Sequence, residues 1–345
     1  MLRDPALVAG LFYMLQEGEQ FLSHGQEALK SPEREAFPKV AVVLLHYGLM
    51  GNGGEATQYT EQCLGSVETI DYPNFEIVVL DAGSTDGFSE KYKEGFSDAF
   101  PRLPKTTLLR FEENVGCAQG YNMAVEYAIK EGAEYLFLLN NDTIVLNSDI
   151  LANLVDVAVR FPEVVAVGPK IYYWKEQEEE PEIIQFIGGR FAYRIVGTGQ
   201  EDRGQFDEER AVDFLSGAAM LVRADVIKRI GLFDPRFFVY LEEFDFAARA
   251  KVAGYKCIFS PGGQVRHKGR HSIDKRYKPP YVEGSARNYM LLIRKHSGKQ
   301  KAQFIIRATT VIGKSIFGII AKEKNPRRLK NLAKSMCDGW RLELE

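Results

Sequence analysis

The sequence predicts an α/β fold in which helices cover a mostly parallel β-sheet. Short apolar runs rich in β-branched residues recur along the chain, and helix-like stretches separate them. The runs are uninterrupted rather than alternating, which is typical of strands buried on both faces. Six runs are expected to be strands: 40–45, 76–80, 107–111, 135–139, 164–167 and 256–259. Two stretches between them, 55–70 and 121–131, are expected to be helices.

The length and composition are those of a globular protein. The 345 residues suffice for one large domain with extensions, and 45% hydrophobic and 26% charged residues are ordinary values. A polar, proline-bounded linker ends at residue 38, so residues 1–38 are predicted to form a helical N-terminal extension. The apolar stretch 6–15 within it is too short to span a bilayer and lacks a signal-peptide cleavage site.

The four cysteines are scattered and show no Cys-x-x-Cys spacing. A disulfide framework and a cysteine-rich zinc site are therefore not expected. The sequence predicts four reduced thiols in a cytosolic protein.

The C-terminal region is strongly basic. Residues 286–345 hold 14 Lys/Arg and 4 Asp/Glu, whereas the rest of the chain is acidic. Apolar residues recur there at helical spacing, and Arg307 and Lys314 interrupt the run. This pattern predicts a helix at an anionic membrane surface rather than a spanning one. The alternative is a helix packed on the main domain with a solvated basic face. The apolar residues are Ile305, Ala308, Ile312, Ile316 and Ile319.

Polar residues follow several predicted strands, at the sheet edge where such folds bind ligands. The string from Asp81 to Gly87 suits a nucleoside, because the carboxylate can accept hydrogen bonds from a base or a ribose. It could equally be an exposed turn. Gly116 and Gly120 lie at the start of a helix and could bring backbone N–H groups to a diphosphate. They match neither the dinucleotide-binding fingerprint nor the P-loop.

The strand 135–139 ends in Asn140, Asn141 and Asp142. Amide and carboxylate oxygens at a sheet edge suit a hard divalent cation such as Mg²⁺ or Mn²⁺. The alternative is that these residues only cap the turn or the next helix.

Three acidic residues, Glu242, Glu243 and Asp245, lie among aromatic side chains. Burial and mutual repulsion would raise the pKa of one carboxylate and make it a candidate general base. Asp245 is expected to pair with Arg249 one turn along the helix. His267 and His271 have the spacing of a zinc pair, but nothing nearby completes such a site.

Taken in order, these strings resemble glycosyltransferase family 2, in its bacterial rhamnosyltransferase- and galactofuranosyltransferase-like branch. The most specific parts are 81–87, 114–122, 140–143, 214–223, 231–234 and 242–255, within a match over about 39–296. The resemblance implies a GT-A fold, which is Rossmann-like. It also implies that one sugar, such as rhamnose or galactofuranose, is transferred with inversion from a UDP- or dTDP-linked donor. The acceptor would be a hydroxyl of a glycan or a lipid-linked glycan. It divides a catalytic domain, 39–275, into a nucleotide-binding half (39–142) and an acceptor half (143–275), followed by a basic helical region, 276–345.

The resemblance also assigns roles to individual residues. It implies that Glu243 is the base and that Asp142 and His267 hold a divalent cation, Mn²⁺ or Mg²⁺. Taken alone, His267 would be interpreted as a structural histidine, and the resemblance overturns that interpretation. The acceptor would contact Gly217, Glu242 and Asp245. The donor pocket would be lined by Tyr47, Asp81, Ser84, Asn114, Gly116, Gly120, Asn140 and Asn141.

The implied partners are a nucleotide sugar, a glycan acceptor and a membrane surface, and no nucleic acid. An oligomer remains open, and the expected location is the cytoplasm or the inner face of the cytoplasmic membrane. Two alternatives stay open. A nucleotidyltransferase would want a basic glycine-rich loop, which 49–54 is not. A relative without catalysis would explain Asn140 in place of the usual Asp and the strand ending His46-Tyr47-Gly48.

Overall fold

The computed structural model describes residues 37–50, 54–192, 195–269 and 281–344. The expected N-terminal extension lies almost entirely outside the described residues, as does His271. Residues Phe37–Glu345 form one compact unit. The expected division of this unit into catalytic halves and a C-terminal region stays a prediction.

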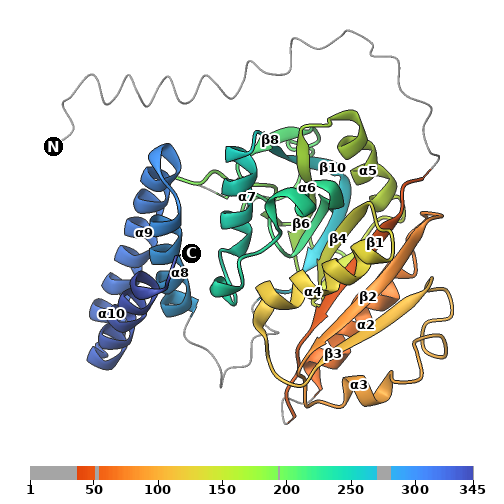
Figure 1. The fold of residues 1–345 in the computed structure, drawn as a ribbon, viewed down its shortest axis with the longest axis horizontal. Coiled ribbons are helices and arrows are strands. Elements are labelled where there is room, and N and C mark those ends of the chain that lie inside the picture. Colours follow the sequence, from red (N-terminus) through yellow and green to blue (C-terminus); the bar gives the residue numbers. More distant parts are fainter. Residues whose placement is uncertain (1–36, 51–53, 193–194, 270–280, 345) are drawn as a thin grey trace, which may run out of the picture. The chain divides into compact units, whose positions relative to one another are not determined.

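A ten-stranded sheet forms the centre of this unit (Figure 1). Its first part is a parallel array in the order β3-β2-β1-β4, as in Rossmann-like folds. The β-branched residues of β1 and the leucines of β4 are buried, so this part of the sheet is covered on both faces. The strands are β1 (Val40–His46), β2 (Phe75–Ala82), β3 (Thr106–Phe111) and β4 (Tyr135–Asn140).

The second part of the sheet mixes directions. β9 (Ala219–Arg223) runs antiparallel between β4 and β6 (Val164–Tyr173), and β10 (Lys256–His267) lies parallel to β6. All six strands that the sequence predicts therefore point the same way. The strands not predicted run in the opposite direction: β9 and the three-residue strands β5 (Thr143–Val145), β7 (Ile184–Phe186) and β8 (Arg210–Val212).

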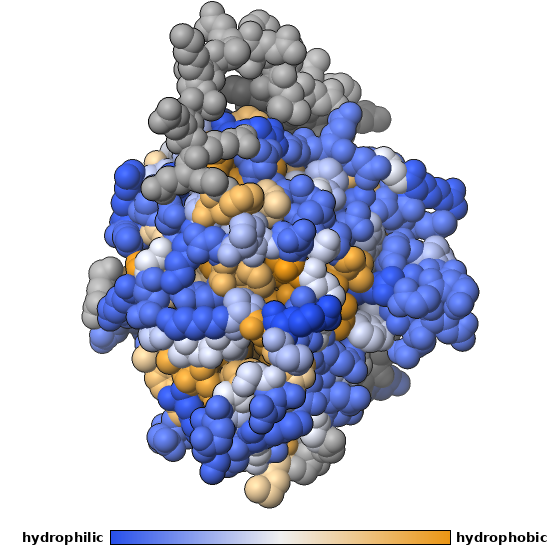
Figure 2. Space-filling view, turned by 90° about the vertical axis from the view of Figure 1, so that its right-hand side faces the viewer, coloured by the Kyte–Doolittle hydropathy of each residue, from blue (hydrophilic) through white to orange (hydrophobic). Residues whose placement is uncertain are grey.

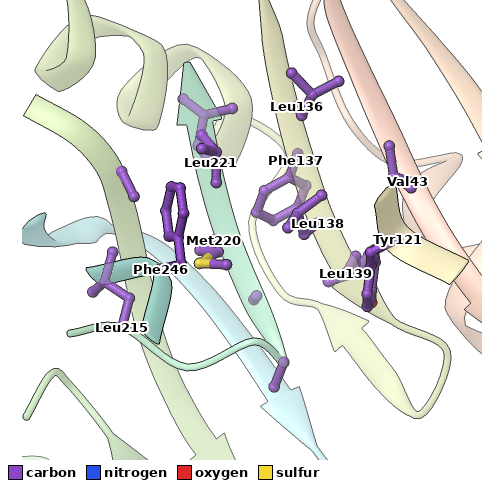
Figure 3. Packing of buried hydrophobic residues seen from close by; sticks show 14 of the residues in the cluster. Val43, Tyr121, Leu136, Phe137, Leu138, Leu139, Leu215, Met220, Leu221 and Phe246 are labelled. Carbon is purple, nitrogen blue, oxygen red and sulfur yellow. The ribbon is translucent and has the colours of Figure 1, made fainter. Parts of the chain in front are cut away.

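Helices pack on this sheet and bury a continuous core (Figure 3). Phe137 of β4, Met220 of β9 and Phe246 of α7 belong to it, and each is at most 1% exposed. Hydrophilic residues cover most of the surface on the side that lies to the right in Figure 1, which Figure 2 shows face on. The helices are α2 (Glu55–Val67), α3 (Phe88–Lys91), α4 (Gly116–Lys130), α5 (Ile150–Arg160), α6 (Ala224–Ile230) and α7 (Glu242–Val252).

Three helices follow the sheet, as expected for the C-terminal region: α8 (Tyr281–Lys295), α9 (Gly298–Gly318) and α10 (Pro326–Arg341). α9 has two different apolar faces. Phe304, Ala308 and Ile312 are buried, and the Phe304 ring lies 5.1 Å from that of Phe191. Ile316 and Phe317 are exposed on another face. One face of α9 therefore packs on the domain, as the packed-helix alternative expects, and contact of the outward face with a membrane stays a prediction.

The helical segment Gly298–Ala321 contains an 18-residue window with a mean hydropathy of 1.6, so by length and composition alone it could cross a membrane. Of that window, 22% is buried within the unit. A single helix of this kind is weak evidence for a membrane span, and a buried core helix passes the same test.

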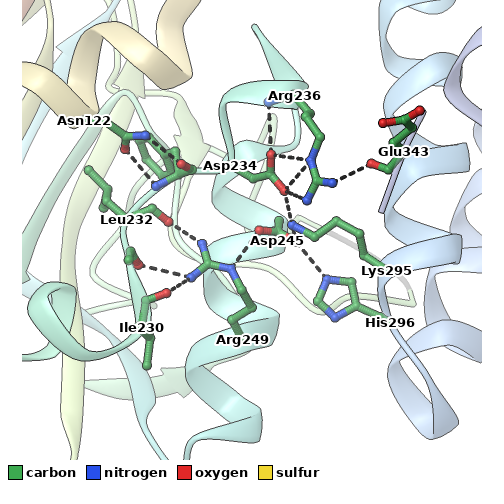
Figure 4. Close-up of polar contacts among 12 residues, drawn as sticks. Asn122, Ile230, Leu232, Asp234, Arg236, Asp245, Arg249, Lys295, His296 and Glu343 are labelled. Carbon is green, nitrogen blue, oxygen red and sulfur yellow. Dashed lines mark hydrogen bonds and ion pairs between the residues drawn. The ribbon is translucent and has the colours of Figure 1, made fainter. Parts of the chain in front are cut away.

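A buried carboxylate joins α7 to α8 (Figure 4). Asp245 is fully buried, and its oxygens accept from Arg249 Nε at 2.8 Å, His296 Nε2 at 3.0 Å and Lys295 Nζ at 2.9 Å. Burial alone would raise the pKa of Asp245, but the His296 hydrogen bond and the Arg249 and Lys295 charges hold it well below its ordinary value. The expected Asp245–Arg249 pair is confirmed.

Asp245→Asn should lower the free energy of unfolding by about 3 kcal/mol at pH 7, because it leaves the partly buried cations Arg249 and Lys295 without a counter-charge. Because the folded pKa is depressed, the contribution of Asp245 is present above about pH 4 and is lost as the pH falls. Urea unfolding at several pH values measures this. Asp156→Asn, in the exposed Asp156–Arg160 pair with the same helical spacing, is the control and should cost less than about 1 kcal/mol. Equal losses in the two variants would contradict the account.

Candidate active site

The turn after β4 meets the end of β10. β5 and β10 pair antiparallel with Thr143 opposite His267, and the Lys268 N–H donates to the Asp142 carbonyl at 3.0 Å. This register places His267 Nε2 3.2 Å from Asp142 Oδ1. The two residues that the resemblance assigns to a metal are therefore brought together by strand pairing.

Gln185 of β7 sets the orientation of His267, a contact that the sequence analysis missed. Its Nε2 donates to the His267 carbonyl at 3.1 Å, so its Oε1 is the atom that faces His267 Nδ1, at 2.6 Å. Nδ1 then carries a proton, and Nε2 is the ring nitrogen that faces Asp142 and could coordinate a cation when it is unprotonated. No sequence signal pointed to Gln185, because β7 was not predicted.

This arrangement fits a divalent cation. His267 Nε2 lies 3.2 Å from Asp142 Oδ1, close enough for the two atoms to share a proton or to bind one cation together. Asp142 is 3% exposed, so its charge is largely removed from water. No group of three His, Cys, Asp or Glu side chains that could hold a metal occurs among the described residues. Mg²⁺ and Mn²⁺ commonly take few protein ligands and complete the set with phosphate and water.

Asn140 and Asn141 link this edge to neighbouring elements. Asn140 Oδ1 accepts from the Tyr121 hydroxyl at 3.1 Å, and its backbone N–H donates to Ala218 at 2.9 Å. Asn141 Nδ2 donates to Thr60 Oγ1 on α2 at 2.8 Å. These contacts fix the turn that carries Asp142. Donor contacts by the two amides stay a prediction.

The edge beside β1 contains a buried histidine that the sequence analysis did not single out. The Thr60 hydroxyl donates to the Ala56 carbonyl at 2.9 Å, so it accepts from His46 Nδ1 at 2.7 Å. His46 Nε2 lies 3.2 Å from Asp86 Oδ2. The His46 ring is therefore held between Thr60 and Asp86. Burial would raise the pKa of Asp86, but hydrogen bonds and charge from His46 lower it to about 2.

Asp81 and Ser84 shape the turn after β2. The Ser84 N–H donates to Asp81 Oδ1 at 2.8 Å, the Ser89 hydroxyl donates to Asp81 Oδ2, and Ser84 Oγ accepts from the Gly48 N–H at 3.0 Å. Asp81 is fully buried, so its visible role is to close this turn, next to the partly exposed Tyr47. Nucleoside contacts by Tyr47, Asp81 and Ser84 stay predictions.

The start of α4 follows β3 and lies at the same carboxyl-terminal edge of the sheet as the turn after β2. Asn114 Oδ1 accepts from the Gly116 N–H at 2.9 Å, and Gly116 has a φ of 77°. A Cβ on Gly120 would approach Leu45 Cδ1 to 2.5 Å, so this glycine is required by the packing of α4 on β1. Diphosphate contacts by Asn114, Gly116 and Gly120 stay predictions.

Glu242 and Glu243 open α7. Glu242 is 7% exposed, and its buried Oε2 has no hydrogen-bond partner within the described part of the chain, whereas Glu243 is partly exposed. Burial raises the pKa of Glu242. Burial and then the charge of Glu242 raise the pKa of Glu243, against the opposing charge of Arg307 on α9. Of the two carboxylates, Glu243 is the one that solvent reaches, and its role as the base stays a prediction.

The other two predicted acceptor residues differ in their surroundings. Gly217 is partly exposed, has open space beside its Cα, and precedes β9, whose first residue pairs with Leu139 next to Asn140. Asp245 is buried, and its oxygens hold the cations of α7 and α8. The geometry of Asp245 supports a structural role, and an acceptor contact by either residue stays a prediction.

Residues 54–231 match the family model described as "Glycosyl transferase family 2", which is just over half of the chain. The chain belongs to glycosyl transferase family 2. The glycosyltransferase is 26% identical over 268 residues to the N-acetylglucosaminyl-diphospho-decaprenol L-rhamnosyltransferase of Mycobacterium tuberculosis, covering 71% of this chain and 83% of the relative. It is also 26% identical over 200 residues to the O-antigen biosynthesis protein RfbC of Myxococcus xanthus, covering 57% of this chain and 15% of that one.

Two solved structures show that the glycosyltransferase has the GT-A fold. The mannosyltransferase PcManGT of Pyrobaculum calidifontis, in complex with GDP-Man and Mn²⁺, matches 98% of this chain and 86% of its own, at 19% identity and a TM-score of 0.55. GalNAc-T7, with UDP, GalNAc and Mn²⁺, matches 84% and 58%, at 18% identity and a TM-score of 0.57. The expected family and fold are confirmed, and a nucleotidyltransferase is not favoured.

Two variants of the glycosyltransferase test the metal site. Asp142→Ala should abolish Mn²⁺-dependent binding of a nucleoside diphosphate, because it removes the buried carboxylate. Gln185→Ala should weaken Mn²⁺ binding by about 10- to 100-fold, because His267 loses the partner that fixes its tautomer. Calorimetric titration with Mn²⁺ and either UDP or dTDP measures both.

Gln62→Ala is the matched control for the Gln185 variant, because Gln62 contacts Lys268 at 2.9 Å and does not contact His267. Unchanged Mn²⁺ affinity in Gln185→Ala, or an equal loss in Gln62→Ala, would show that the Gln185 contact does not prepare His267 for a metal.

Proposed function

We propose that this glycosyltransferase transfers one sugar, with inversion, from a UDP- or dTDP-linked donor to a hydroxyl of a lipid-linked glycan, with Glu243 as the base. The observation that carries the proposal is the position of Glu243: a partly exposed carboxylate with a raised pKa, at the start of a helix tied to the donor-side helix α4. Rhamnose and galactofuranose are the donor sugars that the family branch favours.

Glu243 would accept the proton of the attacking hydroxyl. Its pKa is raised by burial and by Glu242, so it is a stronger base than an ordinary carboxylate while still ionised above that pKa. The buried Glu242 would contribute the repulsion that raises the basicity of its neighbour. A single displacement without a covalent intermediate inverts the anomeric centre.

Asp142 and His267 would hold a divalent cation, which when bound neutralises the charge that develops on the departing diphosphate. Asn140 and Asn141 keep that turn fixed through Tyr121 and Thr60. The His46–Asp86 pair keeps the donor-side turn in place. The two solved structures with Mn²⁺ support a divalent cation and leave open whether Mn²⁺ or Mg²⁺ serves here.

A membrane-bound acceptor is supported by two features. The mycobacterial relative is named for a decaprenol-linked substrate. Large apolar side chains point outward from the end of α9, where Phe317 is 69% exposed, and from the π-helical segment η2 (Ile319–Glu323) that follows it, where Ile320 is 56% exposed. Basic residues flank this helical segment. An apolar stripe with adjacent positive charge suits the surface of an anionic bilayer. We place the protein at the cytoplasmic face of such a membrane.

Glu243→Gln tests the proposed base. The amide is nearly isosteric, so donor binding should persist while turnover falls by at least about 100-fold. Glu242→Gln should cost less. In the unaltered protein, transfer should rise with pH as Glu243 ionises, through an apparent pKa above the ordinary glutamate value, since burial raises it. Transfer assays on both variants and on the unaltered protein over a pH series, with donor affinity measured separately, decide whether Glu243 or Glu242 is the base. Near-normal turnover in Glu243→Gln and collapse in Glu242→Gln would move the base to Glu242.

Replacing Ile316, Phe317 and Ile320 together by Ser tests the membrane surface. These side chains are exposed, so the fold should persist while partition onto anionic vesicles falls at least about 10-fold. Flotation with phosphatidylglycerol-containing vesicles, at low and high salt, measures this. Val252→Ser, an exposed apolar residue on α7, is the control. Equal vesicle binding by the triple variant would remove α9 as the membrane contact.

A further inference from the structure

The connection into α7 has an unusual backbone. Phe238, Tyr240 and Leu241 have φ values of 60°, 76° and 68°, all in the left-handed region that bulky side chains avoid. Each such residue costs of order 1 kcal/mol and persists only when its surroundings hold it. Leu241 is the N-cap of α7, so the next two residues are Glu242 and Glu243. The direction of both carboxylates therefore depends on this left-handed turn, residues 238–241.

One side chain of α8 holds the turn. Asn288 is 1% exposed, and its Nδ2 lies 3.0 Å from the Phe237 carbonyl, 2.9 Å from that of Val239 and 2.7 Å from that of Tyr240. Its Oδ1 accepts from Arg287 Nη1 at 2.7 Å, which fixes the amide with its nitrogen toward the turn. Arg287 also donates to the Arg236 carbonyl at 2.8 Å. Neighbouring residues of α8 thus bind successive carbonyls along this connection.

The left-handed turn also contacts the donor side. The Ala118 N–H at the start of α4 donates to the Phe238 carbonyl at 3.1 Å. The Phe238 ring covers Gly116, where an added Cβ would approach the ring to 2.5 Å. The turn therefore connects α8, the carboxylates of α7 and the donor-side helix α4. A displacement of the turn would misalign the carboxylates relative to the donor.

We propose that Asn288 is a positioning residue for transfer: it holds the left-handed turn so that the first turn of α7 presents its carboxylates correctly. Asn288 touches no substrate in this account and acts only through the backbone of residues 237–240. The proposal rests on the proposed role of the α7 carboxylates in catalysis. It makes α8 part of the catalytic apparatus, although α8 lies beyond the last strand of the sheet.

Asn288→Ala should reduce kcat by about 10- to 100-fold while the affinity for Mn²⁺ and nucleoside diphosphate changes less than about 2-fold. Asn122→Ala is the matched control. Asn122 also ties a helix to this connection through two backbone hydrogen bonds, to Phe233 at 2.7 and 3.0 Å, but outside the left-handed turn. The control should keep kcat within about 3-fold. If Asn288→Ala does not fold, Asn288→Ser takes its place in every measurement.

A double-mutant cycle separates positioning from general stability. Glycine adopts positive φ freely, so Tyr240→Gly should recover at least about 3-fold of the kcat lost in Asn288→Ala, after correction for its own effect in the unaltered protein. Amide hydrogen exchange adds a readout independent of which carboxylate is the base: the amides of residues 238–243 should exchange at least about 10-fold faster in Asn288→Ala.

The outcomes are distinct. Fast exchange with an unchanged kcat would keep the structural role of Asn288 and overturn its role in transfer. Unchanged exchange, or a kcat loss matched by Asn122→Ala and not relieved by Tyr240→Gly, would overturn the proposal. Full transfer by Glu243→Gln and by Glu242→Gln would instead overturn the proposed function, whatever Asn288→Ala does.

Discussion

The active-site edge depends on one strand pairing. β5 follows β4 after a short turn and pairs antiparallel with the end of β10, and the register sets Thr143 opposite His267. Side chains alternate across a strand, so a slip of one residue would turn His267 away from Asp142. Only this register lets Gln185 of β7 contact His267 and lets the Lys268 N–H donate to the Asp142 carbonyl. The geometry of the proposed metal site is thus a consequence of how the last strand closes the sheet.

A second constraint sets the other half of the site. The carboxylates of α7 lie after a turn whose backbone is intrinsically unfavourable, and α8 holds that turn through buried hydrogen bonds. The Asp245 charge cluster adds a second tie between α7 and α8 (Figure 4). A strained backbone and buried charges both lower the stability of the fold, and proteins commonly retain them at functional sites, where they fix the geometry of side chains.

The sequence was informative where physical signals are local. The six same-direction strands are long apolar runs, and each is a strand in the structure. The short strands β5, β7 and β8 have three residues each, too few for a periodic signal, and their pairing depends on distant partners. The predicted helix 121–131 is longer in the structure, Gly116–Lys130, because its start, Gly116–Gly120, contains two glycines and carries no helical signal in the sequence.

The same distinction applies to the site. Asp142, His267 and Glu243 were identified from motif order, and the structure brings Asp142 and His267 together. Gln185, Asn288 and the His46–Asp86 pair act through contacts between residues far apart in the sequence, so no local pattern marks them. Asp245 shows the opposite case. The family resemblance assigns it an acceptor contact, which stays a prediction, and the structure shows its ion pairs with Arg249 on α7 and Lys295 on α8.

Pulsed electron paramagnetic resonance of bound Mn²⁺ tests the central claim most directly. With the nucleoside diphosphate present, the account predicts a nitrogen coupling from one histidine, which changes when the histidines are ¹⁵N-labelled and disappears in His267→Ala. The same spectrum should persist in His46→Ala, because His46 is committed to Thr60 and Asp86. A spectrum without histidine nitrogen coupling in the unaltered protein, or a coupling that survives His267→Ala, would contradict the account.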